Sequence, residues 1–143
     1  MPRRNRNAPN EAHLGSKSPY FLNGNHFSNL TEFYGEVKRV LNLRDVGQLN
    51  LDAFADVLTW PCDHETDRPY ALVWLNSDVS RQRLHHGQMV DLLEEMLRRC
   101  HPSNVPSVTE RLVAAMQGEE PNLFEFLVET IELRAEYVRL VLS

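Results

Sequence analysis

The sequence predicts an α/β fold in which a small three-stranded parallel sheet carries helices packed on it. Three short, largely apolar runs, at residues 19–24, 70–75 and 137–143, have the length and composition of buried strands. Between them lie longer segments whose apolar residues recur every three to four positions, as in amphipathic helices. Because parallel strands need such crossovers, the order strand, two helices, strand, three helices, strand predicts this sheet.

The composition is that of one globular domain preceded by a tail. The chain has 143 residues, of which 42% are hydrophobic and 24% are charged. Residues 1–18 are rich in proline and asparagine and carry four basic side chains against one acidic, so we predict a disordered basic tail. The whole chain has a net charge of −5, so the predicted domain, residues 19–143, carries −8.

Charge, cysteine content and hydropathy restrict the setting and the partners. No apolar run approaches the roughly 20 residues of a membrane span, and the first residues lack the apolar core of a signal peptide. Cys62 and Cys100 are too few for a disulfide framework. We therefore expect a cytoplasmic protein without a membrane partner. An acidic domain repels phosphates, so we expect a basic protein as partner rather than nucleic acid.

The first strand and helix have local signals at their ends. Residues 19–24 read as a strand that ends in a turn at Asn23-Gly24. Asn29 is a candidate N-cap with Glu32 three residues later, which is the spacing of a capping box. A helical apolar pattern follows through residue 41.

The second helix combines an apolar face with two carboxylates. After the loop of residues 44–49, Asn50 can cap a helix that extends to about Trp60. Its apolar residues share one face, and at 100° per residue Asp52 and Asp56 fall roughly opposite. Like charges four residues apart repel each other across a helix turn. Since residues 45–67 hold six acidic side chains and no lysine or arginine, this helix should present a focused negative surface.

The middle of the chain predicts a loop, a strand and a further helix. Residues 61–69 are polar and bounded by prolines, as expected for a loop. Residues 70–75 are nearly all apolar, which predicts a strand covered on both faces. Residues 76–87 indicate a short helix or a turn, and residues 88–100 a clear amphipathic helix.

Two more helices and a strand complete the predicted domain. Residues 101–106 contain two prolines and predict a break. The next helix should begin at Ser107, with Glu110 at capping-box spacing, and the last at Asn122 with Glu125. The final apolar run, from residue 137, is the third strand.

An enzymatic role is disfavoured by the motifs. Asp52, Asp56 and His64 could serve a metal-dependent hydrolase, since paired carboxylates and a histidine bind divalent metals. However, the acidic and histidine residues of the 61–69 loop match no standard zinc spacing, and polar loops collect such side chains routinely. No phosphate-binding, dinucleotide-binding or nucleophile motif occurs. We therefore predict no enzymatic activity, no cofactor and no metal.

The second helix also carries a family resemblance. The segment NLDAFADVLT, residues 50–59, resembles the second helix of the barstar family, the intracellular inhibitors of the bacterial ribonuclease barnase. Residues 19–84 and about 122–143 resemble the remaining strands and helices of that family in order and pattern. The resemblance implies a barstar-like fold in which residues 101–121 are an insertion that carries an extra helix.

The resemblance also implies a function and a site. It implies an antitoxin or immunity protein of a bacterium, a monomer when free, that plugs the cationic active site of a barnase-like ribonuclease or toxin nuclease in a 1:1 complex. Asp56 would occupy a phosphate position, with Asp52 beside it. The partner-binding residues would be Asp52, Asp56, Asn50, Gly47, Leu51, Ala55 and Trp60, together with Glu129 and Glu132 of the helix before the last strand.

The chain departs from the family at two points. The loop of residues 44–49 has no tyrosine where the family loop is rich in it, and Ala55 replaces a tryptophan of the family motif. Aromatic residues of this kind often dominate protein interfaces. These departures imply a cognate nuclease different from barnase. The alternative within the binding class is an adaptor for a basic protein that is not a nuclease.

Overall fold

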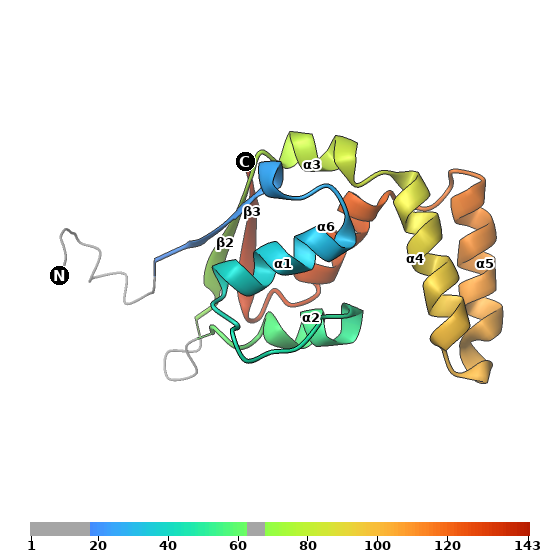
Figure 1. The fold of residues 1–143 in the computed structure, drawn as a ribbon, viewed down its shortest axis with the longest axis horizontal. Coiled ribbons are helices and arrows are strands. Elements are labelled where there is room, and N and C mark those ends of the chain that lie inside the picture. The colour runs from blue at the N-terminus through green and yellow to red at the C-terminus, as the bar shows by residue number, and fades with distance from the viewer. Residues whose placement is uncertain (1–17, 63–67) are drawn as a thin grey trace.

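The computed structural model describes residues 18–62 and 68–143, so the predicted basic tail lies almost entirely outside the described residues (Figure 1). Within them the chain forms three strands and six α-helices. Their order and bounds are β1 (Tyr20–Asn23), α1 (Leu30–Val40), α2 (Leu51–Val57), β2 (Tyr70–Leu75), α3 (Ser77–Arg83), α4 (His86–Arg99), α5 (Val105–Met116), α6 (Leu123–Glu132) and β3 (Val138–Leu142). Short 3₁₀ helices, Gly24–His26 and Pro102–Asn104, follow β1 and precede α5.

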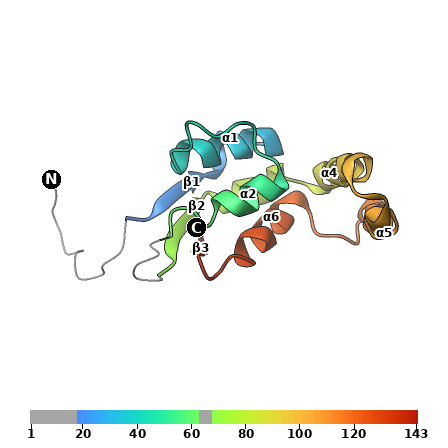
Figure 2. The same ribbon diagram turned by 90° about the horizontal axis from the view of Figure 1, so that it is seen from below.

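The three strands form one parallel sheet with the order β1-β2-β3, which confirms the predicted α/β class. Leu72 at the centre of β2 lies opposite Tyr20 of β1 and Leu140 of β3. Figures 1 and 2 show the strands along one side of the domain, with α1, α2 and α6 against them. The short helix or turn expected after β2 is the helix α3.

The prediction that β2 is covered on both faces is wrong. Burial alternates along the strand, so Leu72 and Trp74 are buried while Val73 between them is half-buried. Val73 lies in register with Phe21 of β1 and Val141 of β3, which are 48% and 42% exposed. The all-apolar run is therefore a strand with one buried face. Its other face carries apolar residues that are only partly covered.

Aromatic side chains form the centre of the core between the sheet and the helices. The ring of Trp74, on β2, is fully buried and stacks on Phe33 of α1 at a centroid distance of 5.3 Å. Phe124 of α6 packs edge-on against Trp74 at a centroid distance of 5.0 Å, and Phe54 of α2 packs against Phe33 at 5.3 Å. Trp74 also donates a hydrogen bond of 2.9 Å to the hydroxyl of Ser80. These rings join α1, α2 and α6 to one strand.

Most of the predicted helix starts are confirmed by side-chain caps. Asn29 and Asn50 accept hydrogen bonds of 2.8 Å from the backbone three residues on, and Asn122 and Glu125 form a reciprocal capping box. The predicted start at Ser107 is wrong, because α5 begins at Val105.

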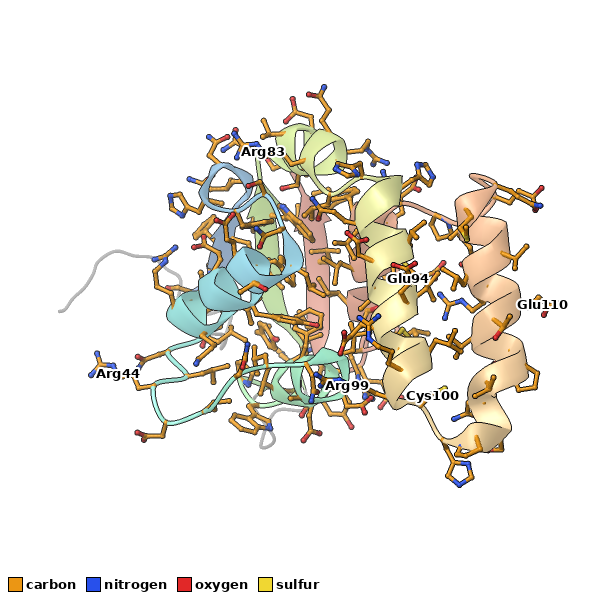
Figure 3. The ribbon with its side chains drawn as sticks, turned by 45° about the vertical axis from the view of Figure 1, so that its right-hand side comes forward. Arg44, Arg83, Glu94, Arg99, Cys100 and Glu110 are labelled. Carbon is orange, nitrogen blue, oxygen red and sulfur yellow. The ribbon has the colours of Figure 1, made fainter. Side chains whose placement is uncertain are left out.

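Two helices form a hairpin beside the sheet domain. Figure 3 shows α4 and α5 running side by side, with Glu94 and Glu110 on them and Cys100 where the chain turns. The predicted insertion of residues 101–121 contains α5 but not α4, and its status as an insertion stays a prediction. In the described part of the chain, no helix combines the length and the hydropathy of a bilayer span.

Candidate protein-binding site

Helix α2 is held on the domain by one apolar face. Two residues of α2, Phe54 and Val57, and its C-cap, Leu58, are at most 2% exposed. Phe54 packs against Phe33 and Tyr34 of α1. At the other end, Asn50 accepts a hydrogen bond of 2.8 Å from the Ala53 N–H, which fixes the first turn. A seven-residue helix is only marginally stable alone, so these contacts determine its position.

The opposite face of α2 presents the two carboxylates to solvent. Asp52 and Asp56 are both exposed, as the 100° spacing predicts, and Asp52 lies in the first turn, where the helix dipole favours a negative charge. Among the described residues, neither carboxylate takes part in an ion pair. Leu51 and Ala55, which flank them, are half-buried. The helix therefore offers unpaired negative charge on a fixed backbone.

Trp60 extends this surface beyond the C-terminal end of α2. Its side chain is 52% exposed, in contrast to the buried Trp74. The backbone before it is fixed twice: the Tyr70 hydroxyl donates a bond of 2.6 Å to the carbonyl of Leu58, and the Thr59 hydroxyl donates one of 2.8 Å to that of Asp56. Trp60 thus supplies a large aromatic surface next to the acidic face.

The loop before α2 contributes exposed backbone and a basic flank. Gly47 is exposed, and nothing lies within 4 Å of the position that a Cβ would take, so no steric reason restricts this position to glycine. Nearer α1, a shallow concavity of about 380 Å³ is lined by Lys38, Arg39, Asn42, Leu43 and Arg44. Figure 3 shows Arg44 projecting outward from this region. This cluster of basic side chains was not predicted from the sequence.

The two predicted glutamates lie on a different element. Glu129 and Glu132 are exposed on α6, the helix that precedes β3. Among the described residues, no hydrogen bond or ion pair joins either of them to α2. Asn50, Leu51, Asp52, Ala55 and Asp56 thus lie together on α2 and its N-cap, whereas Glu129 and Glu132 lie on α6.

One buried tyrosine beside α2 was not predicted from the sequence. Tyr34 of α1 is 9% exposed, and its ring lies 5.9 Å from that of Phe54. Its hydroxyl is buried without a hydrogen-bond partner among the described residues. Burial raises the pKa of Tyr34, and the charge of Asp52 raises it further, so the hydroxyl stays protonated at neutral pH.

The described residues do not assemble a metal centre. No group of three or more histidine, cysteine, aspartate or glutamate side chains in residues 18–62 and 68–143 is arranged to hold an ion. His64, which the hydrolase alternative requires, lies outside the described residues, as do its neighbours from 63 to 67. Cys62 is a buried free thiol whose Sγ lies 3.4 Å from the carbonyl of Arg68.

Comparison with known protein families identifies a family for this chain. A family model described as Barstar (barnase inhibitor) matches residues 19–110, which is more than half of the chain. The matched segment contains α2 and the loop before it, whereas Glu129 and Glu132 lie beyond its end. Searches of curated proteins and of solved structures find no match.

Proposed function

Because this chain belongs to the barstar family of barnase inhibitors, we propose that it inhibits a bacterial ribonuclease by placing α2 in the active site of that enzyme. Members of the family are inhibitors and not enzymes, and the chain is accordingly an inhibitor protein. The proposal concerns the identity of the target, the residues that bind it and the way in which they block it.

The exposed, unpaired carboxylates on a firmly seated helix carry the proposal. Asp52 and Asp56 project from a backbone that is fixed by Phe54 below and by Asn50 at its start. Arginine, lysine and histidine line a site that must bind phosphates and stabilise a phosphoryl transition state. Carboxylates on a rigid element can form charge-assisted hydrogen bonds with those cations in place of substrate. Repulsion between the aspartates is then relieved in the complex.

We assign the contacts by their place on the surface. Asp56 occupies a phosphate position and Asp52 lies beside it, while Leu51, Ala55 and Trp60 form the apolar margin. Asn50 and Gly47 form polar contacts with the nuclease from the loop before α2. Glu129 and Glu132 are candidates for one further acidic contact from α6.

Net charge favours rapid association with a basic partner. The sequence from residue 19 onward carries −8, and long-range attraction of the kind known for the barnase–barstar pair itself speeds encounter. We propose a 1:1 complex, formed by a monomer that resides in the cytoplasm and protects a bacterium from a nuclease toxin. The loop of residues 44–49 without tyrosine, and Ala55 in place of the family tryptophan, favour a target other than barnase.

An inhibition assay tests this function. RNA cleavage by barnase, and by any small basic nuclease encoded beside this chain, is measured with increasing amounts of the protein. We expect cleavage by at least one of these enzymes to stop at one equivalent, and the Asp52→Ala/Asp56→Ala variant not to stop it. Asp78→Asn is the matched control, since Asp78 is exposed on α3, which Figure 1 places at the opposite end of the domain.

The remaining outcomes decide against the proposal. Binding of a nuclease without inhibition would indicate the adaptor alternative. Inhibition that survives loss of both aspartates would show that α2 is not the inhibitory element.

A further inference from the structure

The shallow concavity beside the loop that leads into α2 gathers positive charge on an acidic protein. Its lining comes from the last turn of α1 and from the chain directly after it: Lys38, Arg39, Asn42, Leu43 and Arg44. The sequence from residue 19 onward carries a net charge of −8. Three cations around one hollow are therefore a local reversal of sign.

The end of α1 fixes the shape of this concavity. Asn42 has a positive φ of 59°, which turns the chain back on the helix. The N–H of Leu43 donates a hydrogen bond of 2.8 Å to the carbonyl of Lys38. The N–H of Asn42 donates one of 3.3 Å to the carbonyl of Arg39, which completes the bond pattern of a Schellman cap. Because the Leu43 side chain is only 8% exposed, it anchors the returning chain and places Arg44 beside the last turn of α1.

Two of the three cations have no side-chain partner in the part of the chain that the structure describes. Arg39 is engaged, since its guanidinium donates hydrogen bonds of 3.1 Å and 2.9 Å to Glu36. Lys38 and Arg44 form no ion pair there, not even Arg44 with its neighbour Asp45. The helix dipole accounts for Lys38, because it favours cations in the last turn, but not for Arg44 beyond the helix.

The concavity lies within reach of the proposed interface. Arg44 begins the loop that ends at Asn50, the cap of α2, and six residues of chain span at most about 20 Å. A standard interface covers about 800 Å² on each partner, which corresponds to a patch roughly 30 Å across. Figure 3 shows Arg44 at the end of the molecule that carries α2. A nuclease that covers α2 and the exposed Gly47 of this loop therefore also approaches the concavity.

Unpaired cations beside an acidic face restrict the partners that fit. A nuclease surface that is basic throughout would be attracted to the aspartates of α2 and repelled by Lys38 and Arg44. Like charges brought together in an interface cost affinity, whereas a carboxylate opposite the concavity would attract. Two patches of opposite sign also fix the orientation of a partner and exclude others, which a single acidic patch does less well.

We propose that this concavity receives an acidic side chain of the nuclease, so that the inhibitor recognises a cationic active site together with a carboxylate beside it. This inference rests on the proposed function and adds an oppositely charged contact to the acidic face of α2. Lys38 and Arg44 provide the free charge, while Arg39 lines the hollow and stays bonded to Glu36. A protein carboxylate fits better than an RNA phosphate, because the acidic domain repels the rest of an RNA strand.

Charge reversal at two matched positions tests this contact. Dissociation constants are measured without RNA for the nuclease that the protein inhibits, either barnase or the one encoded beside this chain. Arg44→Glu and Arg83→Glu change the net charge by the same amount, and both side chains are exposed. Figure 3 shows Arg83 at the opposite end of the molecule from Arg44, so only Arg44 borders the proposed interface.

The two variants should change affinity in different directions. Added negative charge favours encounter with a basic nuclease, so Arg83→Glu should leave the dissociation constant unchanged or lower it. Arg44→Glu should raise it at least about 5-fold, because repulsion replaces an exposed ion pair. Lys38→Gln should raise it about 2- to 3-fold, since it removes one cation without adding an opposing charge. Long-range attraction cannot cause these increases, so they would indicate a local acidic partner.

A charge swap identifies the acidic group on the nuclease. Each aspartate and glutamate of the nuclease is changed to lysine in turn and tested against the wild-type inhibitor and Arg44→Glu. We expect one of these changes to weaken binding of the wild type and to restore binding of Arg44→Glu, as for two groups in contact.

The outcomes separate the inference from the function on which it rests. Equal dissociation constants of Arg44→Glu and Arg83→Glu, or tighter binding of Arg44→Glu, would overturn the acidic contact and leave inhibition through α2 intact. Absence of a restoring lysine would also overturn it. Failure of the wild-type protein to inhibit either nuclease would contradict the proposed function, and the inference with it.

Discussion

The carboxylate of Glu36, on α1, accepts a hydrogen bond of 2.9 Å from the backbone N–H of Asn23, the last residue of β1. Glu36 is only 5% exposed, and Arg39 and His26 approach the same carboxylate at 2.9 Å and 3.1 Å. Burial alone would raise the pKa of Glu36, but the hydrogen bonds from Arg39, Asn23 and His26 outweigh it and hold the pKa below its ordinary value. The charged form thus joins a strand end to a helix.

This arrangement predicts an acid-sensitive contribution to stability. A carboxyl whose pKa is lowered by folding stabilises the native state above its unfolded pKa of 4.5, and the contribution is lost as the pH falls through the folded pKa. Glu36→Gln should therefore lower the free energy of unfolding by about 1–3 kcal/mol at pH 7, and the difference from wild type should shrink below about pH 4.5. Urea denaturation at several pH values measures it; a difference independent of pH would contradict the assignment.

Gly24 should not tolerate a side chain. A Cβ at this position would lie 2.4 Å from the carbonyl oxygen of Asn76 and 2.4 Å from the Ser80 hydroxyl, so the segment after β1 would have to move away from α3. We expect Gly24→Ala to lower the free energy of unfolding by roughly 1–3 kcal/mol. Gly35→Ala is the control, because it lies in α1 with nothing within 4 Å and should stabilise the helix by about 0.5–1 kcal/mol. Equal effects of the two changes would contradict the steric explanation.

Removing the Phe54 side chain should loosen α2. The side chain is fully buried against Phe33 and Tyr34, so Phe54→Ala leaves a cavity under a short helix and should cost about 3–5 kcal/mol of stability. Chemical denaturation measures the loss, and amide hydrogen exchange should show the greatest loss of protection in α2. Leu133→Ala, at an 82% exposed position, should change stability by less than about 0.5 kcal/mol. Unchanged protection in α2 would show that other contacts hold the helix.

The acidic face should control the rate of association. Asp56→Ala is expected to weaken binding to the target nuclease roughly 30-fold or more, the scale of an interface hot spot, for which the barstar family is itself a reference case. Because exposed charges are screened within about 10 Å at 0.1 M salt, the wild-type association rate should fall steeply with added salt. Stopped-flow mixing at several salt concentrations should show a weaker dependence for Asp56→Ala than for Asp78→Asn. The same dependence in both variants would exclude a special role for Asp56.

Local chemistry made the helix starts and the acidic face predictable. Asn50 and Asn122 act through side-chain bonds that span three residues, so the sequence alone contains the information for them. The exposure of Asp52 and Asp56 follows from helix periodicity once Phe54 is placed inward. The parallel pairing of the strands was also predictable, since crossovers through helices impose it.

Other features could not be predicted, because the same local sequence fits two structures or because they depend on contacts between distant segments. Pro106 reads as a break, yet proline is accepted in the first turn of a helix, and α5 begins one residue before it. Val73 is as apolar as its buried neighbours, so the sequence does not reveal that its face is only partly covered. The missing partner of the Tyr34 hydroxyl depends on how α1 meets α2, which no short-range pattern encodes.

The two tryptophans allow the proposed interface to be observed directly. Trp60 is 52% exposed beyond α2, whereas Trp74 is fully buried in the core. In protein labelled with 5-fluorotryptophan, the ¹⁹F resonance of Trp60 should shift between H₂O and D₂O, and that of Trp74 should not. Trp60→Phe assigns the two signals, since it removes only one of them.

Addition of unlabelled nuclease should then move the Trp60 resonance and abolish its solvent shift, because docking on α2 would cover the ring. The Trp74 resonance should stay in place, since its ring is fully buried and docking would not cover it further. The titration should end at one equivalent if the complex is 1:1. A Trp60 signal that keeps its position and its solvent shift at saturation would show that the complex leaves Trp60 uncovered, and the acidic face of α2 would then have to bind the nuclease without the aromatic surface beside it.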